Sequence, residues 1–104
     1  MAITNFQVTA TTGTAAFTAA ADVAVTVIYI TNKSATDGNV DVYVVPSAAS
    51  VGENYKIYNN VSIKAQDTYI IESEKLILAS GDKIYITAPD SAAQFNATIS
   101  TIGL

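Results

Sequence analysis

The 104-residue sequence contains no cysteine, no histidine, no arginine and no tryptophan. Without cysteine and histidine it lacks a disulfide framework, the commonest zinc ligands and the usual nucleophile–base pairs of enzymes. Without arginine, only five lysines stand against nine carboxylates, and so few scattered cations do not form the basic patch that binds nucleic acid. The sequence therefore predicts no enzyme activity, no bound cofactor and no nucleic-acid partner.

Long hydrophobic runs are also missing. The longest mainly apolar stretch, residues 23–30, is far shorter than the ~20 residues that a membrane helix needs, and no secretory signal follows Met1. We therefore expect no membrane contact and synthesis in the cytoplasm. Charged residues make up only 13% of the chain and apolar residues 50%, a composition that predicts a folded core rather than a disordered segment.

Strand patterns dominate the sequence. Alternating apolar and polar residues predict half-buried strands over 39–45, 83–88 and 95–100, while residues 23–31 are apolar on both faces, as in a central strand. Shorter strands are predicted within 4–9, 15–19, 55–58, 61–64, 68–72 and 75–78. Turn signals separate these segments at Asp37-Gly38, Asn59-Asn60 and Ser80-Gly81-Asp82.

About eight short strands spaced near ten residues predict an all-β fold. We expect an antiparallel β-sandwich of immunoglobulin-like or jelly-roll type. The predicted inward residues are Val25, Val27, Val40, Val42, Val44, Ile84, Ile86, Phe95, Ala97 and Ile99.

The length suits a single domain over residues 1–104, but residues 1–21 differ in kind from the rest. Residues 9–21 consist mainly of threonine, alanine and glycine, and Phe17 is their one large side chain. This segment is either a loop with an edge strand or an extended N-terminal arm that orders against a neighbouring copy.

Calcium is the one metal for which the sequence offers candidate ligands. Asp37, Asn39 and Asp41 form an alternating oxygen-rich triplet, and Asp82 and Asp90 flank a predicted strand. An EF-hand loop needs further ligands and a terminal glutamate at fixed spacing, and these are absent. We therefore interpret Asp37-Gly38 as turn chemistry and expect no metal site.

Three Asn-x-Ser/Thr triplets occur in the chain. They begin at Asn32, Asn60 and Asn96. Such triplets accept glycans only in secreted eukaryotic proteins. In a chain so rich in serine and threonine, and without a secretory signal, we interpret them as chance matches.

The predicted outward faces carry more large apolar groups than a monomer usually exposes. Tyrosine enrichment combined with few charges is typical of interface cores. Either the chain's own arm or loops cover this second face, or other subunits do, and we expect subunit contact. The expected interface residues are Tyr43, Val45, Tyr69, Ile71, Ile77 and Tyr85.

Four segments carry a resemblance to a known family. An apolar strand ends in a polar turn at 27–32 (VIYITN), and a valine-rich strand closes with proline at 40–46 (VDVYVVP). A leucine-rich run passes through Gly81-Asp82 into an alternating strand over 75–88, and a last strand lies at 97–100. From about residue 23 to residue 104, this pattern resembles a small β-sandwich module of tailed-bacteriophage structural proteins.

The resemblance implies a virion protein without catalytic residues. It favours a capsid decoration or cement subunit, with a neck, collar or tail-associated subunit as the alternative. The implied partners are other virion proteins, either the major capsid protein or neck and tail subunits, and further copies in a homo-oligomer. A hypothesis of another class is a carbohydrate-binding adhesive module that uses Tyr43, Tyr69 or Tyr85 as stacking platforms.

Overall fold

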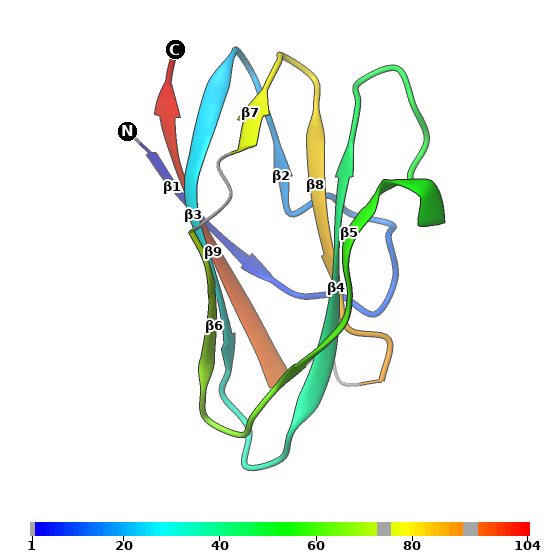
Figure 1. The fold of residues 1–104 in the computed structure, drawn as a ribbon, viewed down its shortest axis with the longest axis vertical. Helices are drawn as coiled ribbons and strands as arrows, with labels where there is room; N and C mark the ends of the chain where they lie inside the picture. Colours follow the sequence, from blue (N-terminus) through cyan, green and yellow to red (C-terminus); the bar gives the residue numbers. More distant parts are fainter. Residues whose placement is uncertain (1, 73–75, 91–93) are drawn as a thin grey trace.

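The computed structural model describes residues 2–72, 76–90 and 94–104. Within these ranges the chain forms nine strands and one short 3₁₀ helix, η1 (Figure 1). The elements are β1 (Ala2–Gln7), β2 (Phe17–Thr18), β3 (Val23–Asn32), β4 (Gly38–Val45), η1 (Glu53–Tyr55), β5 (Lys56–Ile63), β6 (Thr68–Ile71), β7 (Leu76–Leu78), β8 (Lys83–Thr87) and β9 (Phe95–Gly103).

The strands form two sheets that pack face to face. Sheet A has the order β1-β9-β3-β6, and β7 pairs with the other end of β3; sheet B has the order β2-β8-β4-β5. All pairs between these strands are antiparallel. The prediction of an all-β antiparallel sandwich is therefore confirmed, while its finer type stays a prediction.

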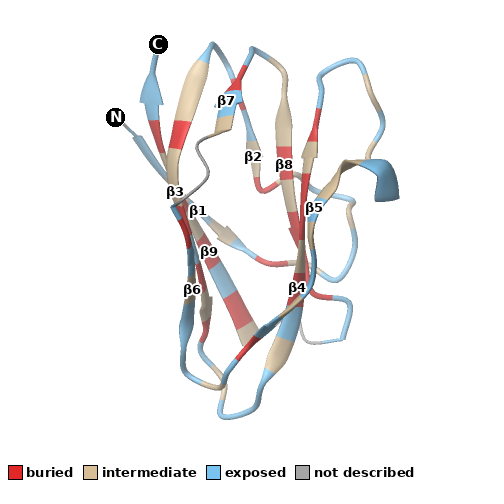
Figure 2. Cartoon of the chain, viewed as in Figure 1, coloured by how far each residue is buried: buried red, intermediate tan, exposed pale blue. Residues whose placement is uncertain are grey.

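The core lies between the sheets and draws on both. Figure 2 shows buried residues alternating with exposed or intermediate ones along most of β9, as expected for a strand with one face inward. Of the ten residues predicted to point inward, eight are buried and Val44 is partly buried against the core. The eight are Val25, Val40, Val42, Ile84, Ile86, Phe95, Ala97 and Ile99.

The inward prediction for Val27 is wrong, and a β-bulge explains the error. Val25 pairs with Thr101 whereas Val27 pairs with Ser100, so Thr26 is an extra residue in β3. An extra residue shifts the two-residue alternation by one position. Beyond the bulge Ile28 is therefore buried, and Val27 lies on the outer face.

A second irregularity corrects the predicted turn at Asn59-Asn60. Both residues lie inside β5, which joins the two short strands predicted at 55–58 and 61–64. The pairing of β4 with β5 shifts register here, and Asn60 has a φ of 55°. Asparagine tolerates this left-handed conformation better than most residues, so the turn-like pair marks a bulge rather than a chain reversal.

Residues 2–21, for which the sequence left an extended arm open, lie on the body of the same chain. β1 pairs with β9 along its whole length, and β2 pairs with β8. Val8 and Ala16, between these strands, and Ala19, just after β2, are buried in the core. The two ends of the chain meet at one end of sheet A, where Ala2 pairs with Thr101 (Figure 1).

Candidate functional site

The outer face of sheet A is the strongest candidate for a functional surface. Strand register groups its outward residues into four rows across the sheet. The rows are Ile102-Ala24-Ile77, then Ile3-Ser100-Val27, then Asn5-Thr98-Tyr29-Ile70, and finally Gln7-Asn96-Thr31-Thr68. We call these fourteen residues the outer face of sheet A.

Exposed apolar side chains gather at one end of this face. Seven large apolar residues are exposed in the described ranges, and five of them belong to it. Ile77 and Ile3 are 71% and 68% exposed, the largest values on the face. The five are Ile3, Tyr29, Ile70, Ile77 and Ile102. A surface of this kind in a folded domain is typical of an interaction site.

Polarity rises along the face toward the opposite end. The last row contains only amide and hydroxyl side chains, and Thr31 and Thr68 hydroxyls lie 3.2 Å apart across the strands. Beside this row, Lys33 Nζ donates hydrogen bonds to Gln7 Oε1 and Asn96 Oδ1, each at 3.3 Å. The face therefore has an apolar end beside the chain termini and a hydrogen-bonding end opposite.

None of the fourteen residues is charged, although the chain carries fourteen charged residues in all. Depletion of charge is the compositional mark of an interface core. The formal net charge of −4 is therefore carried by residues outside these four rows. This face thus combines exposed apolar groups with the absence of charge.

Only one of the six interface residues predicted from sequence lies on this face, namely Ile77. The expected exposure of Tyr43, Val45 and Ile71 is wrong, since they are 8%, 1% and 5% exposed. Ile71 points into the core because it pairs with Ile28 across sheet A. Val45 lies on β4, which η1 of the same chain contacts.

The remaining two tyrosines do not complete a shared aromatic face. Tyr69 is half-buried against the core, with its ring 6.1 Å from that of Tyr58 in an edge-on arrangement. Tyr85 is half-buried beside Tyr43 on sheet B. The predicted residues are therefore divided between two sheets, and an interface role stays a prediction for Tyr69, Ile77 and Tyr85.

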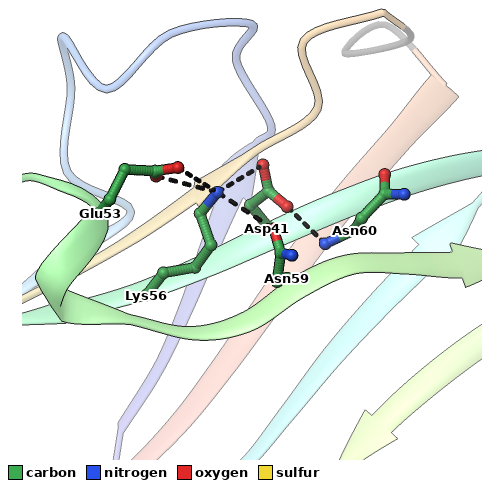
Figure 3. Close-up of polar contacts among 5 residues, drawn as sticks. All are labelled: Asp41, Glu53, Lys56, Asn59 and Asn60. Atoms are coloured by element: carbon green, nitrogen blue, oxygen red, sulfur yellow. Dashed lines mark hydrogen bonds and ion pairs between the residues drawn. The ribbon is translucent and has the colours of Figure 1, made fainter.

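Lys56 lies over the ring of the buried Tyr43. Its Nζ lies 5.4 Å from the centre of the Tyr43 ring, a distance that suits a cation–π contact. The same ammonium lies 2.9 Å from Glu53 Oε2 and 3.7 Å from Asp41 Oδ2 (Figure 3). The hydrogen bond to Glu53, more than the charge of Asp41, raises the pKa of Lys56 above its ordinary value. The chain itself thus occupies this part of sheet B.

A polar hollow of about 290 Å³ gathers four of the five residues weighed as calcium ligands. They are Asp37, Asn39, Asp41 and Asp90, joined there by Gly38, Asn60, Pro89 and Gln94. Two of the carboxylates already accept hydrogen bonds from backbone amides. Asp37 accepts one from the Ala65 amide at 2.9 Å, and Asp41 accepts one from the Asn60 amide at 2.6 Å. Within the described part of the chain, no three acidic side chains are placed to hold a metal.

Asp82, the fifth of those residues, ties two loops together instead. Its carboxylate accepts hydrogen bonds from the backbone amides of Ser47, at 3.0 Å, and Ala79, at 2.9 Å. Gly81 adopts a φ of 91°, and a Cβ there would lie 2.7 Å from the Ser47 Cβ. The Gly-Asp pair is therefore a structural junction between the loops after β4 and β7.

Comparison with protein-family models, curated proteins and solved structures gives no match. In the described ranges there is no helix with the length and apolar character required to cross a membrane. The outer face of sheet A depends on the bulge at Thr26, which places Val27 and Tyr29 on the outside. No residue pattern in β3 marks that bulge, so the sequence offered no signal that would have located this face.

Proposed function

We propose that this chain is a structural subunit of a tailed-phage virion, and that it stabilises the particle through repeated protein–protein contacts. Capsid decoration is the position we favour, with a neck, collar or tail-associated position as the alternative. The single observation that carries the proposal is the uncharged outer face of sheet A with its exposed apolar rows. The resemblance of residues 23–104 to virion modules is the reason for placing these contacts in a phage particle.

The physical role follows from the repetition of weak contacts. Burying apolar surface contributes roughly 25 cal/mol per Å², from which the costs of association are subtracted. One small face gives modest affinity, but linked copies on a symmetric shell bind with far greater avidity than a single copy. A decoration subunit needs a rigid scaffold with an apolar binding face rather than a catalytic cleft, and a two-sheet sandwich offers such a scaffold.

The adhesive alternative finds less support. It depended on Tyr43, Tyr69 and Tyr85 as exposed stacking platforms, and none of the three is an exposed residue in the structure. Tyr29, at 40%, is the exposed aromatic residue on the outer face of sheet A. A single tyrosine among isoleucines does not form the aromatic groove that a sugar-binding module needs.

Copy number in purified particles tests the proposal. Quantitative mass spectrometry would compare this chain with the major capsid protein in virions from the phage that encodes it. Decoration predicts a ratio of the order of one, whereas a neck or collar position predicts a ratio lower by an order of magnitude or more. Absence of the chain from particles made with the gene intact would overturn the proposal.

Particles assembled without the gene provide the matched control. If the chain decorates the shell, such particles should be less resistant to heating, and added purified chain should restore both occupancy and resistance. If the chain belongs to the neck or tail, particles without it should fail at tail attachment instead. Particles that are indistinguishable from wild type in both respects would count against a structural role.

A further inference from the structure

We infer that the outer face of sheet A packs against the same face of a second copy of this chain. The inference rests on the proposed function in one respect, because it names a partner within the particle. It is also testable on the isolated chain, so its outcome is separate from the presence of the chain in virions. Three properties of the face identify a second copy as its occupant.

The first property is charge. Copies of this chain carry a net charge of −4 and repel one another on approach. None of the fourteen residues of this face is charged, and the Lys33 ammonium lies at its polar end, hydrogen-bonded to Gln7 and Asn96. Two like-charged copies can therefore bring their apolar rows together without placing a charged residue of these rows in the contact. A basic partner would instead be matched by a carboxylate-bearing surface, which this face is not.

The second property is area. The face has fourteen positions in four rows of three or four strands, and at about 4.8 Å between strands and about 6.7 Å between rows it covers roughly 450 Å² when taken as flat. Two opposed faces then cover about 900 Å² before the relief of the side chains is added, close to the roughly 1,000 Å² at which specific interfaces begin. A second copy supplies a surface of matching size.

The third property is self-complementarity under a two-fold axis. Two sheets that face each other through a two-fold axis have that axis in the plane between them. If the axis runs along the strands, the rows Ile102-Ala24-Ile77 of the two copies meet. If it runs across the strands through the row containing Val27, the apolar rows still meet each other. Either arrangement covers Ile77 and leaves Val27 near the axis.

Packing of this kind repeats the geometry already inside the molecule. Sheets pack face to face about 10 Å apart with their strands roughly aligned, and isoleucine and tyrosine side chains fill the space between them. Tyr29 and Ile70 pair directly across β3 and β6 in the third row. They extend the apolar contact toward the centre, while the amides and hydroxyls of the fourth row form a wet rim.

Sedimentation analysis of the isolated chain tests the inference. The wild-type chain should show a reversible monomer–dimer equilibrium in the micromolar to millimolar range. Ile77→Lys places a charge in the apolar row and should weaken dimerisation by at least tenfold. Circular dichroism should show an unchanged sheet signal, because Ile77 is 71% exposed and its loss removes little core packing.

Two substitutions on sheet B serve as controls. Ile57→Lys makes the same change at an exposed isoleucine of β5, which is 45% exposed, and should leave dimerisation unchanged. Tyr85→Lys tests the face predicted from sequence and should also leave it unchanged. A wild-type chain that stays monomeric at millimolar concentration would overturn the inference, as would dimers that Ile57→Lys or Tyr85→Lys disrupts and Ile77→Lys does not.

The cysteine-free sequence allows a second readout. Val27→Cys places the only thiol near the predicted two-fold axis, and Ser62→Cys places it on the exposed outer side of β5 in sheet B. Ser62 is the more exposed position, so random collisions would oxidise Ser62→Cys faster. The inference predicts the reverse, with Val27→Cys forming disulfide-linked dimers several times faster. Equal rates, or faster linkage through Ser62→Cys, would overturn it.

Discussion

At the residue scale, a fully buried asparagine connects three segments at the polar end of the sandwich. Asn32 Nδ2 donates to the carbonyl oxygens of Thr36, at 2.8 Å, and Ile63, at 3.1 Å, while its Oδ1 accepts from the Ser34 amide at 3.0 Å. Buried polar side chains are stable when they are hydrogen-bonded in this way. Because Asn32 is 0% exposed, the Asn-x-Ser triplet that begins there is a structural feature and not a glycan acceptor in the folded chain.

Gly81 is the other position where one residue type is required. Its φ of 91° is strained for any side chain, and a Cβ would meet Ser47 at 2.7 Å. We expect Gly81→Ala to lower the free energy of unfolding by at least about 2 kcal/mol, from backbone strain of about 1–2 kcal/mol and the added clash. Urea unfolding monitored by circular dichroism measures the loss.

Two further variants separate the clash from the strain. The double change Ser47→Gly with Gly81→Ala removes the Cβ that would be met and should recover part of the lost stability. Gly52→Ala is the matched control, because Gly52 has an extended backbone and nothing within 4 Å of an added Cβ, so its effect should be neutral or slightly stabilising. Equal losses in Gly52→Ala and Gly81→Ala would contradict this account of the Gly-Asp junction.

At the element scale, bulges in β3 and β5 decide which residues the strands present outward. One of the two register shifts between β4 and β5 lies at Asn60, whose φ of 55° is held by a 2.6 Å hydrogen bond from its amide to Asp41 Oδ1. We expect Asn60→Gly to retain stability, since glycine adopts positive φ readily. Asn60→Val should cost about 1–2 kcal/mol, because a β-branched residue is poorly tolerated there. Thermal unfolding of both variants measures the difference.

A valine substitution at the neighbouring Asn59 is the control for the loss of an asparagine side chain. Asn59 is an exposed neighbour in the same strand with no positive φ, and its Oδ1 accepts an exposed hydrogen bond from Lys56 Nζ at 3.2 Å. Asn59→Val removes that bond but suits a strand, so it should cost less stability than Asn60→Val. If both valine variants lose the same stability, the cause is the lost asparagine side chain and not the backbone conformation of the bulge.

These bulges also explain which parts of the molecule the sequence could predict. In β4, β8 and β9, apolar and polar residues alternate at the positions that matter. The sequence therefore correctly assigns Val40, Ile84 and Ile99 to the core. In β3 one extra residue reverses the facing, and both faces there are apolar, so no change of polarity marks the reversal. The apolar rows around Val27 were missed for that physical reason.

Burial of a side chain under a segment that is distant in sequence also cannot be predicted from local alternation. Tyr43 has the sequence context of an outward strand residue, and it is covered because Lys56 pairs with it from β5 and lays its ammonium over the ring. Such contacts depend on strand order, which alternation does not encode. Ile77 was correctly placed outside because its neighbours Leu76 and Leu78 take the opposite face in a strand of three residues.

At the scale of the whole molecule, the four rows of the outer face of sheet A contain no charged residue, whereas the chain carries a net charge of −4. The molecule measures 38 × 27 × 20 Å, and the Debye length is about 30 Å at 0.01 M salt but about 8 Å at 0.15 M. At low salt, carboxylates on the far side of one copy therefore act on a second copy docked at the outer face of sheet A. At physiological salt that repulsion is largely screened, while the apolar contact remains.

Association of copies should consequently strengthen as salt rises. We expect the dimer dissociation constant to fall severalfold between 0.01 M and 0.15 M NaCl, measured by sedimentation at constant pH. Asp90→Asn removes one exposed carboxylate off the outer face of sheet A, so it should tighten association at low salt and reduce the salt dependence. A dissociation constant that rises with salt would instead indicate paired charges across the interface, and an interface with paired charges is not the uncharged face of this sheet.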